Sequence, residues 1–246
     1  MILLLDLGNT RLKWALADGD RLIERGAFAW ETDAVDTALQ ALLIRAERLA
    51  AAWLASVTNA ARVDAVAELL RCYGIPLQRL GPPAHLPSLR LAYADPSRLG
   101  VDRWLAMRAA QRRWPGTLVV ASCGSALTID ALAGHAHLGG VIAPSPARMR
   151  EALLQRAPHL ASASGAITPF AANTADAVES GAVLAAAALV DRLVDATAQR
   201  VGDTPRLVLT GGGSDELAHW LQHRPLIEPD LVLLGVLDAA LAAPGG

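Results

Sequence analysis

The stretch that decides the fold is LLLDLGNTRLK, residues 3–13. Its aliphatic run is typical of a buried strand, yet the run ends on an acid, a glycine and two small polar residues. Aspartate and glycine are both disfavoured inside strands. Asp6, Gly8, Asn9 and Thr10 therefore predict a tight turn, which is either an ordinary hairpin or a place where the backbone approaches an anion.

Hydrophobic patterning outward from this turn predicts alternating strands and helices. In the first half we expect strands at 2–7, 11–17, 21–28 and 53–57 and helices at 34–49, 60–72 and 99–114. Four prolines within residues 81–98 predict an irregular loop before the last of these helices.

The pattern starts again after the Pro-Gly break at residues 115–116. Here we expect two strands joined by a turn within 117–132, strands at 136–143 and 206–210, and helices at 146–157, 173–200, from about 214 and from about 230. A shift of 116 residues places Asp6 on Ser122 and Gly8 on Gly124. This internal duplication predicts two α/β lobes, residues 1–114 and 115–246, with a cleft between them.

The composition narrows the class of protein. Of 246 residues, 53% are hydrophobic and 19% charged, and the net charge of −2 argues against nucleic-acid binding by bulk charge. Cys72 and Cys123 lie far apart and suggest no disulfide framework. No signal peptide is indicated, and the longest uncharged apolar stretch, 180–190, is far shorter than the ~20 residues that span a membrane. We therefore expect a cytoplasmic protein.

The turn at residues 8–10 is interpreted either as a phosphate-binding turn or as an ordinary hairpin. Backbone N–H groups of Gly8, Asn9 and Thr10 would bind phosphate, Asp6 would hold Mg²⁺ or its waters, and Lys13 would contact the phosphate as a point charge. The alternative is a Gly-Asn hairpin with a surface lysine.

Two further glycine-containing segments are likewise interpreted either as ligand-binding loops or as plain structural turns. GSALT, residues 124–128, is a second small-residue turn at the corresponding place in the other half. TGGGS, residues 210–214, follows a strand and opens a helix, so its backbone would lie flat against a base or sugar. A plain hairpin and a glycine-rich connection are the alternatives.

GVDRW, residues 100–104, places an acid and an arginine in the first turn of a helix. Asp102 there is either a cap that interacts with the helix dipole or a base that takes a proton from a hydroxyl. Arg103 would bind a substrate oxyanion.

Taken in order, DLGNTRLK, GVDR, GSALTID, GGVIAPS, NTADAVESG and TGGGS resemble the type III pantothenate kinases over nearly the whole chain. This resemblance implies two duplicated ribonuclease H-like lobes of the actin-like, sugar-kinase and Hsp70-like ATPase superfamily, with mixed sheets flanked by helices. It implies transfer of the γ-phosphoryl group of ATP to the primary hydroxyl of pantothenate, which gives 4′-phosphopantothenate, the first step of coenzyme A biosynthesis. It further implies Mg²⁺, a monovalent cation such as K⁺ or NH₄⁺, and a homodimer.

The resemblance also implies roles for individual residues. The family's positions for binding ATP and its phosphates correspond here to Asp6, Gly8, Asn9, Thr10, Lys13, Gly124, Ser125, Thr128, Gly211, Gly212 and Gly213. Asp102 matches the general base of the family. The family's pantothenate-binding positions correspond to Tyr93, Gly100 and Arg103, and to Thr174 from across a dimer interface.

One departure from the family pattern concerns the monovalent cation. The second phosphate motif normally begins with an aspartate associated with that cation, and this chain has Ser122 there. A non-catalytic transcriptional accessory protein on the same scaffold is the alternative function. The presence of Asp102 and Lys13 favours catalysis.

Overall fold

The computed structural model describes residues 1–46, 49–81, 89–160 and 165–243. The chain forms two compact units. The first comprises Met1–Ser88, Tyr93–Ala109 and Asp230–Gly246, and the second comprises Leu89–Ala92 and Ala110–Pro229. The division expected at residues 114 and 115 stays a prediction about the domains, and the last helix packs within the first unit.

The first unit is built on a five-stranded mixed sheet in the order β3-β2-β1-β4-β5. Its strands are β1 (Ile2–Leu7), β2 (Arg11–Asp18), β3 (Arg21–Ala29), β4 (Ala51–Ser56) and β5 (Leu77–Arg79). Strands β1, β2 and β3 are antiparallel, whereas β4 and β5 run parallel to β1. The central position of β1 explains why its aliphatic run is almost wholly buried.

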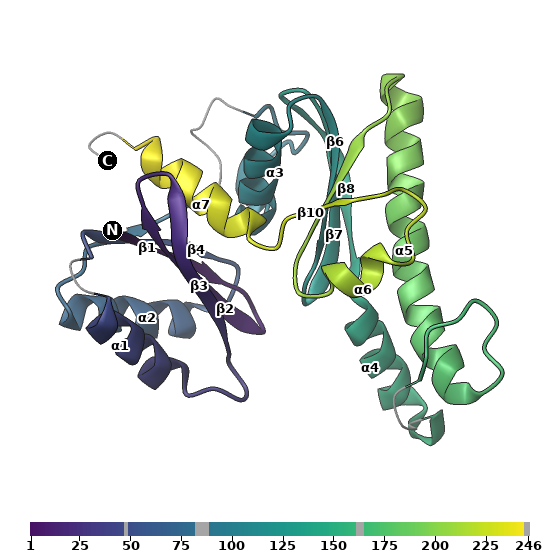
Figure 1. Cartoon of the computed structure of the whole chain (residues 1–246), viewed down its shortest axis with the longest axis horizontal. Helices are drawn as coiled ribbons and strands as arrows, with labels where there is room; N and C mark the ends of the chain where they lie inside the picture. Colours follow the sequence, from purple (N-terminus) through teal and green to yellow (C-terminus); the bar gives the residue numbers. More distant parts are fainter. Residues whose placement is uncertain (47–48, 82–88, 161–164, 244–246) are drawn as a thin grey trace. The chain divides into compact units, whose positions relative to one another are not determined.

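Helices cover both faces of this sheet (Figure 1). The helices of the unit are α1 (Val35–Arg45), α2 (Ala60–Cys72), the 3₁₀ turn η1 (Pro96–Arg98), α3 (Val101–Arg113, in this unit through Ala109) and α7 (Leu231–Leu241). Leu3, Leu5 and Leu7 pack with α1 and α2, so the alternation of a strand turns Leu4 and Asp6 to the opposite face, where α7 contacts β1.

The second unit repeats this sheet topology. Its strands are β6 (Thr117–Cys123), β7 (Ala126–Ala133), β8 (Ala136–Pro144), β9 (Arg206–Thr210) and β10 (Leu226–Ile227), in the order β10-β9-β6-β7-β8. Because β6 occupies the place of β1 and β9 that of β4, the two sheets share one strand order. The predicted duplication of mixed α/β architecture is confirmed.

One face of the second sheet packs against helices. The helices are α4 (Pro146–Arg156), the 3₁₀ turn η2 (Pro158–Leu160), α5 (Thr174–Val201) and α6 (Ser214–Ala218). Val119, Ala121 and Cys123 of β6 share a hydrophobic core with Ala186 and Val190 of α5. Ser122 therefore faces away from this core, as Asp6 does in the first unit.

Most of the predicted elements are found within a few residues of their expected bounds. The helix expected at 34–49 ends at Arg45, and residues 47–48 lie outside the described part, as do residues 82–88 of the expected loop. The strands β5 and β10 are not predicted by the sequence pattern. Among the described residues, no helix is both long enough and apolar enough to cross a membrane.

Candidate active site

The turn between β1 and β2 brings two opposite charges to one sheet face. The strand register pairs Asp6 with Lys13, and the N–H of Gly8 donates to the carbonyl of Arg11 at 3.0 Å, which closes the turn. Asp6 is only 9% exposed. Its burial raises the pKa of the Asp6 carboxyl to about 6, with the Lys13 charge lowering that pKa and the Asp102 charge raising it.

Asp102 lies in the first turn of α3. Its Oδ1 accepts a hydrogen bond from the N–H of Arg103 at 2.8 Å, and the N–H of Trp104 donates to the carbonyl of Gly100 at 3.1 Å. A Cβ at Gly100 would lie 2.6 Å from Asp102 Oδ1, so the glycine leaves the room that this carboxylate uses. Because the Asp102 charge acts on Asp6, the expected base and the expected magnesium ligand belong to one electrostatic site in the first unit.

Tyr93 and Arg103, both expected to bind substrate, contact one another. Arg103 Nη1 donates to Tyr93 Oη at 2.9 Å, and the guanidinium carbon lies 5.8 Å from the centroid of the tyrosine ring. Arg103 is buried and Tyr93 is half-buried. The tyrosine thus fixes the orientation of a buried cation one residue after Asp102.

The corresponding turn of the second unit lacks both charges. Ser122 and Thr128 are paired in the register of β6 and β7, in the places that Asp6 and Lys13 take in the first turn. This turn is also shorter, because the N–H of residue 124 donates to the carbonyl of residue 126 at 2.9 Å. The carbonyl of Ser125 accepts a hydrogen bond from the buried hydroxyl of Ser145 at 3.2 Å.

The glycines of TGGGS lie against the end of β6. Gly211 has a φ of +97°, and a Cβ there would lie 2.3 Å from the carbonyl oxygen of Cys123. A Cβ at Gly213 would lie 2.7 Å from Cys123 Sγ, and the N–H of Gly213 donates to the Cys123 carbonyl at 3.0 Å. Burial, with the nearby charge of Glu216, raises the pKa of the Cys123 thiol to about 11. The loop holding Gly211, Gly212 and Gly213 is therefore adjacent to Gly124, which follows Cys123 in the chain.

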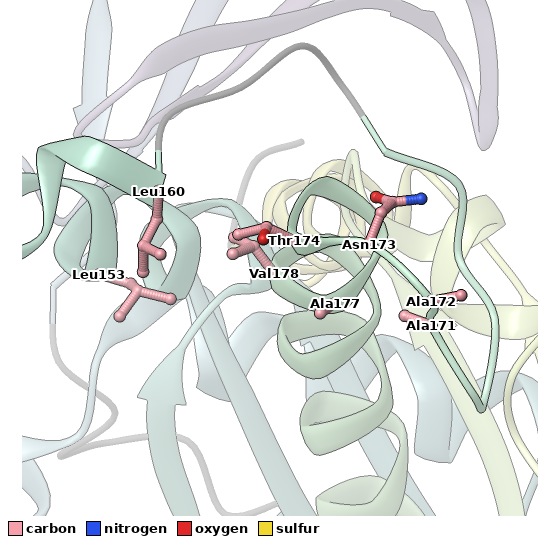
Figure 2. A pocket seen from close by; sticks show the side chains of 8 residues that line it. All are labelled: Leu153, Leu160, Ala171, Ala172, Asn173, Thr174, Ala177 and Val178. Carbon is pink, nitrogen blue, oxygen red and sulfur yellow. The ribbon is translucent and has the colours of Figure 1, made fainter.

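Thr174 belongs to the second unit, whereas the other residues expected to bind pantothenate belong to the first. It begins α5, and the side chain of the preceding Asn173 caps that helix by accepting from the N–H of Asp176. Both line a hollow of about 530 Å³, shown in Figure 2. The other lining residues are apolar: Leu153, Leu160, Ala171, Ala172, Ala177 and Val178.

The expected site residues therefore fall into groups within each unit. The first unit holds Asp6, Gly8, Asn9, Thr10, Lys13, Tyr93, Gly100, Asp102 and Arg103, and the second holds Ser122, Gly124, Ser125, Thr128, Thr174, Gly211, Gly212 and Gly213. Within the described part of the chain, no group of three or more His, Cys, Asp or Glu side chains is arranged to hold a metal ion. One carboxylate such as Asp6 still fits Mg²⁺, which is usually held by one or two carboxylates together with substrate phosphates.

Sequence reasoning missed two residues that contact the first turn. Trp30 donates from its indole Nε1 to the carbonyl of Gly8, and Arg62 donates to the carbonyl of Asn9. Neither residue belongs to a motif, and both are distant in sequence from the turn. The only sequence signal is weak: Trp30 directly follows β3, and Arg62 lies in the first turn of α2.

Comparison with known proteins identifies relatives over the whole chain. A family model described as "Type III pantothenate kinase" matches residues 2–196. The type III pantothenate kinase of Chromobacterium violaceum is 35% identical over 98% of this chain and 99% of that protein. A type III pantothenate kinase of Xanthomonas campestris pv. campestris is 41% identical over 87% of each chain.

A solved structure shows the same fold at low sequence identity. Component A of the (R)-2-hydroxyglutaryl-CoA dehydratase from Acidaminococcus fermentans matches with a TM-score of 0.56 and 16% identity, over 98% of this chain and 96% of that chain. This likeness supports the actin-like ATPase fold that the family resemblance implies.

Proposed function

Because the chain belongs to the type III pantothenate kinase family, we propose that it transfers the γ-phosphoryl group of ATP to the primary hydroxyl of pantothenate. One observation in the structure supports this proposal above the others. The turn expected to bind phosphate, with Asp6 and Lys13, belongs to the same unit as Asp102, and the charge of Asp102 contributes to the raised pKa of Asp6.

Phosphoryl transfer depends mainly on positioning and on neutralising charge, and the first unit offers groups for both. The N–H groups of the turn at residues 8–10 and the ammonium group of Lys13 would bind phosphate oxygens. Asp6 would hold Mg²⁺, which when bound neutralises charge on the β- and γ-phosphates. Asp102, which matches the general base of the family and lies in the first turn of α3, would accept the proton of the pantothenate hydroxyl.

In the second unit we assign the phosphates to Gly124, Ser125 and Thr128 and the adenosine to the loop at residues 211–213. The positive φ of Gly211 and the close approach of this loop to Cys123 favour a flat backbone surface without side chains. Such a surface suits the face of a purine or a ribose.

Arg103 would bind the carboxylate of pantothenate, because its guanidinium group is buried and is oriented by Tyr93. Gly100 leaves the room that the Asp102 carboxylate occupies beside the proposed substrate site. In a homodimer the partner subunit's Thr174 would complete this pocket. The hollow around Thr174 supports that assignment, because it exposes a hydroxyl among apolar side chains.

The second turn suggests a weaker dependence on a monovalent cation. Ser122 offers a neutral hydroxyl where the family pattern has a carboxylate, and its neighbour Thr128 is neutral as well. We therefore propose that K⁺ or NH₄⁺ raises turnover only slightly, and that Ser122→Asp increases the dependence. The free thiols of Cys72 and Cys123 are consistent with a cytoplasmic location.

A coupled assay of ADP release with and without pantothenate tests the proposed function, across added K⁺, Na⁺ and NH₄⁺. We expect pantothenate-dependent turnover that falls by ~10²–10⁴-fold in Asp102→Asn, while ATP binding is retained. Turnover without pantothenate dependence would contradict the substrate assignment. Absence of both turnover and ATP binding would favour the transcriptional accessory role instead.

A further inference from the structure

Three backbone carbonyls in succession, at the turn between β1 and β2, are each held by a donor from outside the turn. Trp30 Nε1 donates to the Gly8 carbonyl at 2.9 Å, and the backbone N–H of Trp30 donates to the Thr10 carbonyl at 3.1 Å. Arg62 Nη1 donates to the Asn9 carbonyl between them at 2.6 Å. Two residues thus engage every carbonyl of the three-residue turn.

The two residues also support one another. The guanidinium carbon of Arg62 lies 4.6 Å from the centroid of the Trp30 ring, which is a cation–π contact. Arg62 also donates to Thr58 Oγ1 at 3.3 Å, and its backbone N–H is capped by Asn59 Oδ1 at 3.0 Å at the start of α2. The start of α2 is therefore tied to the turn by one arginine.

The direction of the carbonyls sets the direction of the N–H groups. In a trans peptide the C=O of one residue and the N–H of the next point in opposite directions. Because the carbonyls of Gly8 and Asn9 point at Trp30 and Arg62, the N–H groups of Asn9 and Thr10 point away from them. A carbonyl oxygen that rotated toward a phosphate would instead repel it.

We propose that Trp30 and Arg62 are positioning residues that keep the carbonyls of residues 8–10 turned away from the nucleotide, so that the N–H groups of Asn9 and Thr10 face its phosphates. This rests on the proposed function, since it takes ATP as the ligand of the turn. Arg62 acts through the turn and contacts backbone oxygen, so it differs from Lys13, whose charge would meet the phosphate directly.

The test compares variants that remove one donor each. Trp30→Phe keeps an aromatic face for Arg62 but removes the indole N–H, and Arg62→Leu removes the guanidinium group. Arg62→Lys keeps a single cationic donor. Arg71→Gln is the matched control, because Arg71 lies on the same helix and pairs with Glu68 on the helix surface.

We expect Trp30→Phe and Arg62→Leu each to raise the KM and the Kd for MgATP about fivefold to tenfold, the usual worth of one to two hydrogen bonds. The KM for pantothenate should stay within about twofold of the wild-type value. Arg62→Lys should recover most of the affinity for MgATP that Arg62→Leu loses, and Arg71→Gln should change neither the KM nor the Kd for MgATP. A purely structural role would not separate the two substrates in this way.

Several outcomes would overturn the inference. The inference is wrong if folded Trp30→Phe and Arg62→Leu bind MgATP as tightly as the wild type does. It is also wrong if these variants lose affinity for MgATP and for pantothenate equally. If the wild-type protein binds MgATP in calorimetry but does not phosphorylate pantothenate, the proposed function alone fails, and the Kd values for MgATP still decide the inference. If the wild-type protein binds no nucleotide, both are wrong.

Discussion

Replacing Asp6 by asparagine should make the ligand-free protein more stable at alkaline pH. Asp6 is 9% exposed on the sheet face that α7 covers, and its burial raises its pKa from 3.8 to about 6. Between these two pH values the folded state holds a proton that the unfolded state has lost. Stability therefore falls as the pH rises from about 4 to about 6, and the full loss persists above pH 6.

The size of the change in unfolding free energy follows from the pKa shift of Asp6. About two pKa units at ~1.4 kcal/mol each give about 3 kcal/mol of destabilisation at pH 8 from the ionised Asp6. Asparagine cannot ionise, but its amide still buries polar atoms, so the net gain should be ~1–2 kcal/mol. For a chain of this length that gain raises the melting temperature by roughly 2–8 °C, and near pH 4 it should vanish.

Thermal and urea unfolding of the wild type and of Asp6→Asn, at pH 4 and pH 8 with chelator and without nucleotide, measure this gain. The exposed Asp20→Asn serves as a control and should change stability by less than ~0.5 kcal/mol at either pH. The Asp6→Asn variant should also lose most of its turnover, because Asp6 is the proposed magnesium ligand. A variant that is less stable than the wild type at pH 8, or a gain that is equal at both pH values, would refute the reasoning.

Four other perturbations have defined outcomes. Gly211→Ala should lower the free energy of unfolding in urea by ~2–4 kcal/mol, because its φ is +97° and its new Cβ would lie 2.3 Å from a carbonyl oxygen. Gly181→Ala on α5, where a Cβ meets nothing within 4 Å, should instead stabilise by up to ~1 kcal/mol, and equal effects of the two would contradict the packing. At pH 8 an alkylating reagent followed by mass spectrometry should modify exposed Cys72 and spare Cys123, whose buried thiol has its pKa raised to about 11, until the chain unfolds. Asp191→Ala should lower the free energy of unfolding in urea by ~2–4 kcal/mol, because the buried Asp191 carboxylate accepts hydrogen bonds from the backbone N–H groups of residues 222 and 223. A decrease below ~0.5 kcal/mol would contradict that role.

The sequence predicts those parts of the fold that depend on local pattern. The aliphatic run of β1, the turn after it and the capped start of α2 are all encoded by neighbouring residues. The short strands β5 and β10 were missed because they have three and two residues. Neither is long enough for an alternating pattern, and their pairing with β4 and β9 defines them.

The site is predictable only in part for a similar reason. Motifs identified the turn with Asp6 and the helix start with Asp102, but local pattern alone did not bring these two acids together. The contacts of Trp30 and Arg62 with the turn span 22 and 53 residues of sequence. Such contacts arise from tertiary packing, which a single sequence read locally does not specify.

The packing of α7 onto the first sheet has a consequence for how the protein is made. The helix lies more than 220 residues after β1 in the chain, yet it contacts β1, β2 and β4, and Asp230 just before it forms an ion pair with Arg25 of β3. During translation, strands β1 to β4 therefore emerge from the ribosome long before residues 231–241, whose helix covers that face. Until then the apolar face is open to chaperones and to other nascent chains, and the second unit, which needs no later segment, is able to complete its own sheet first.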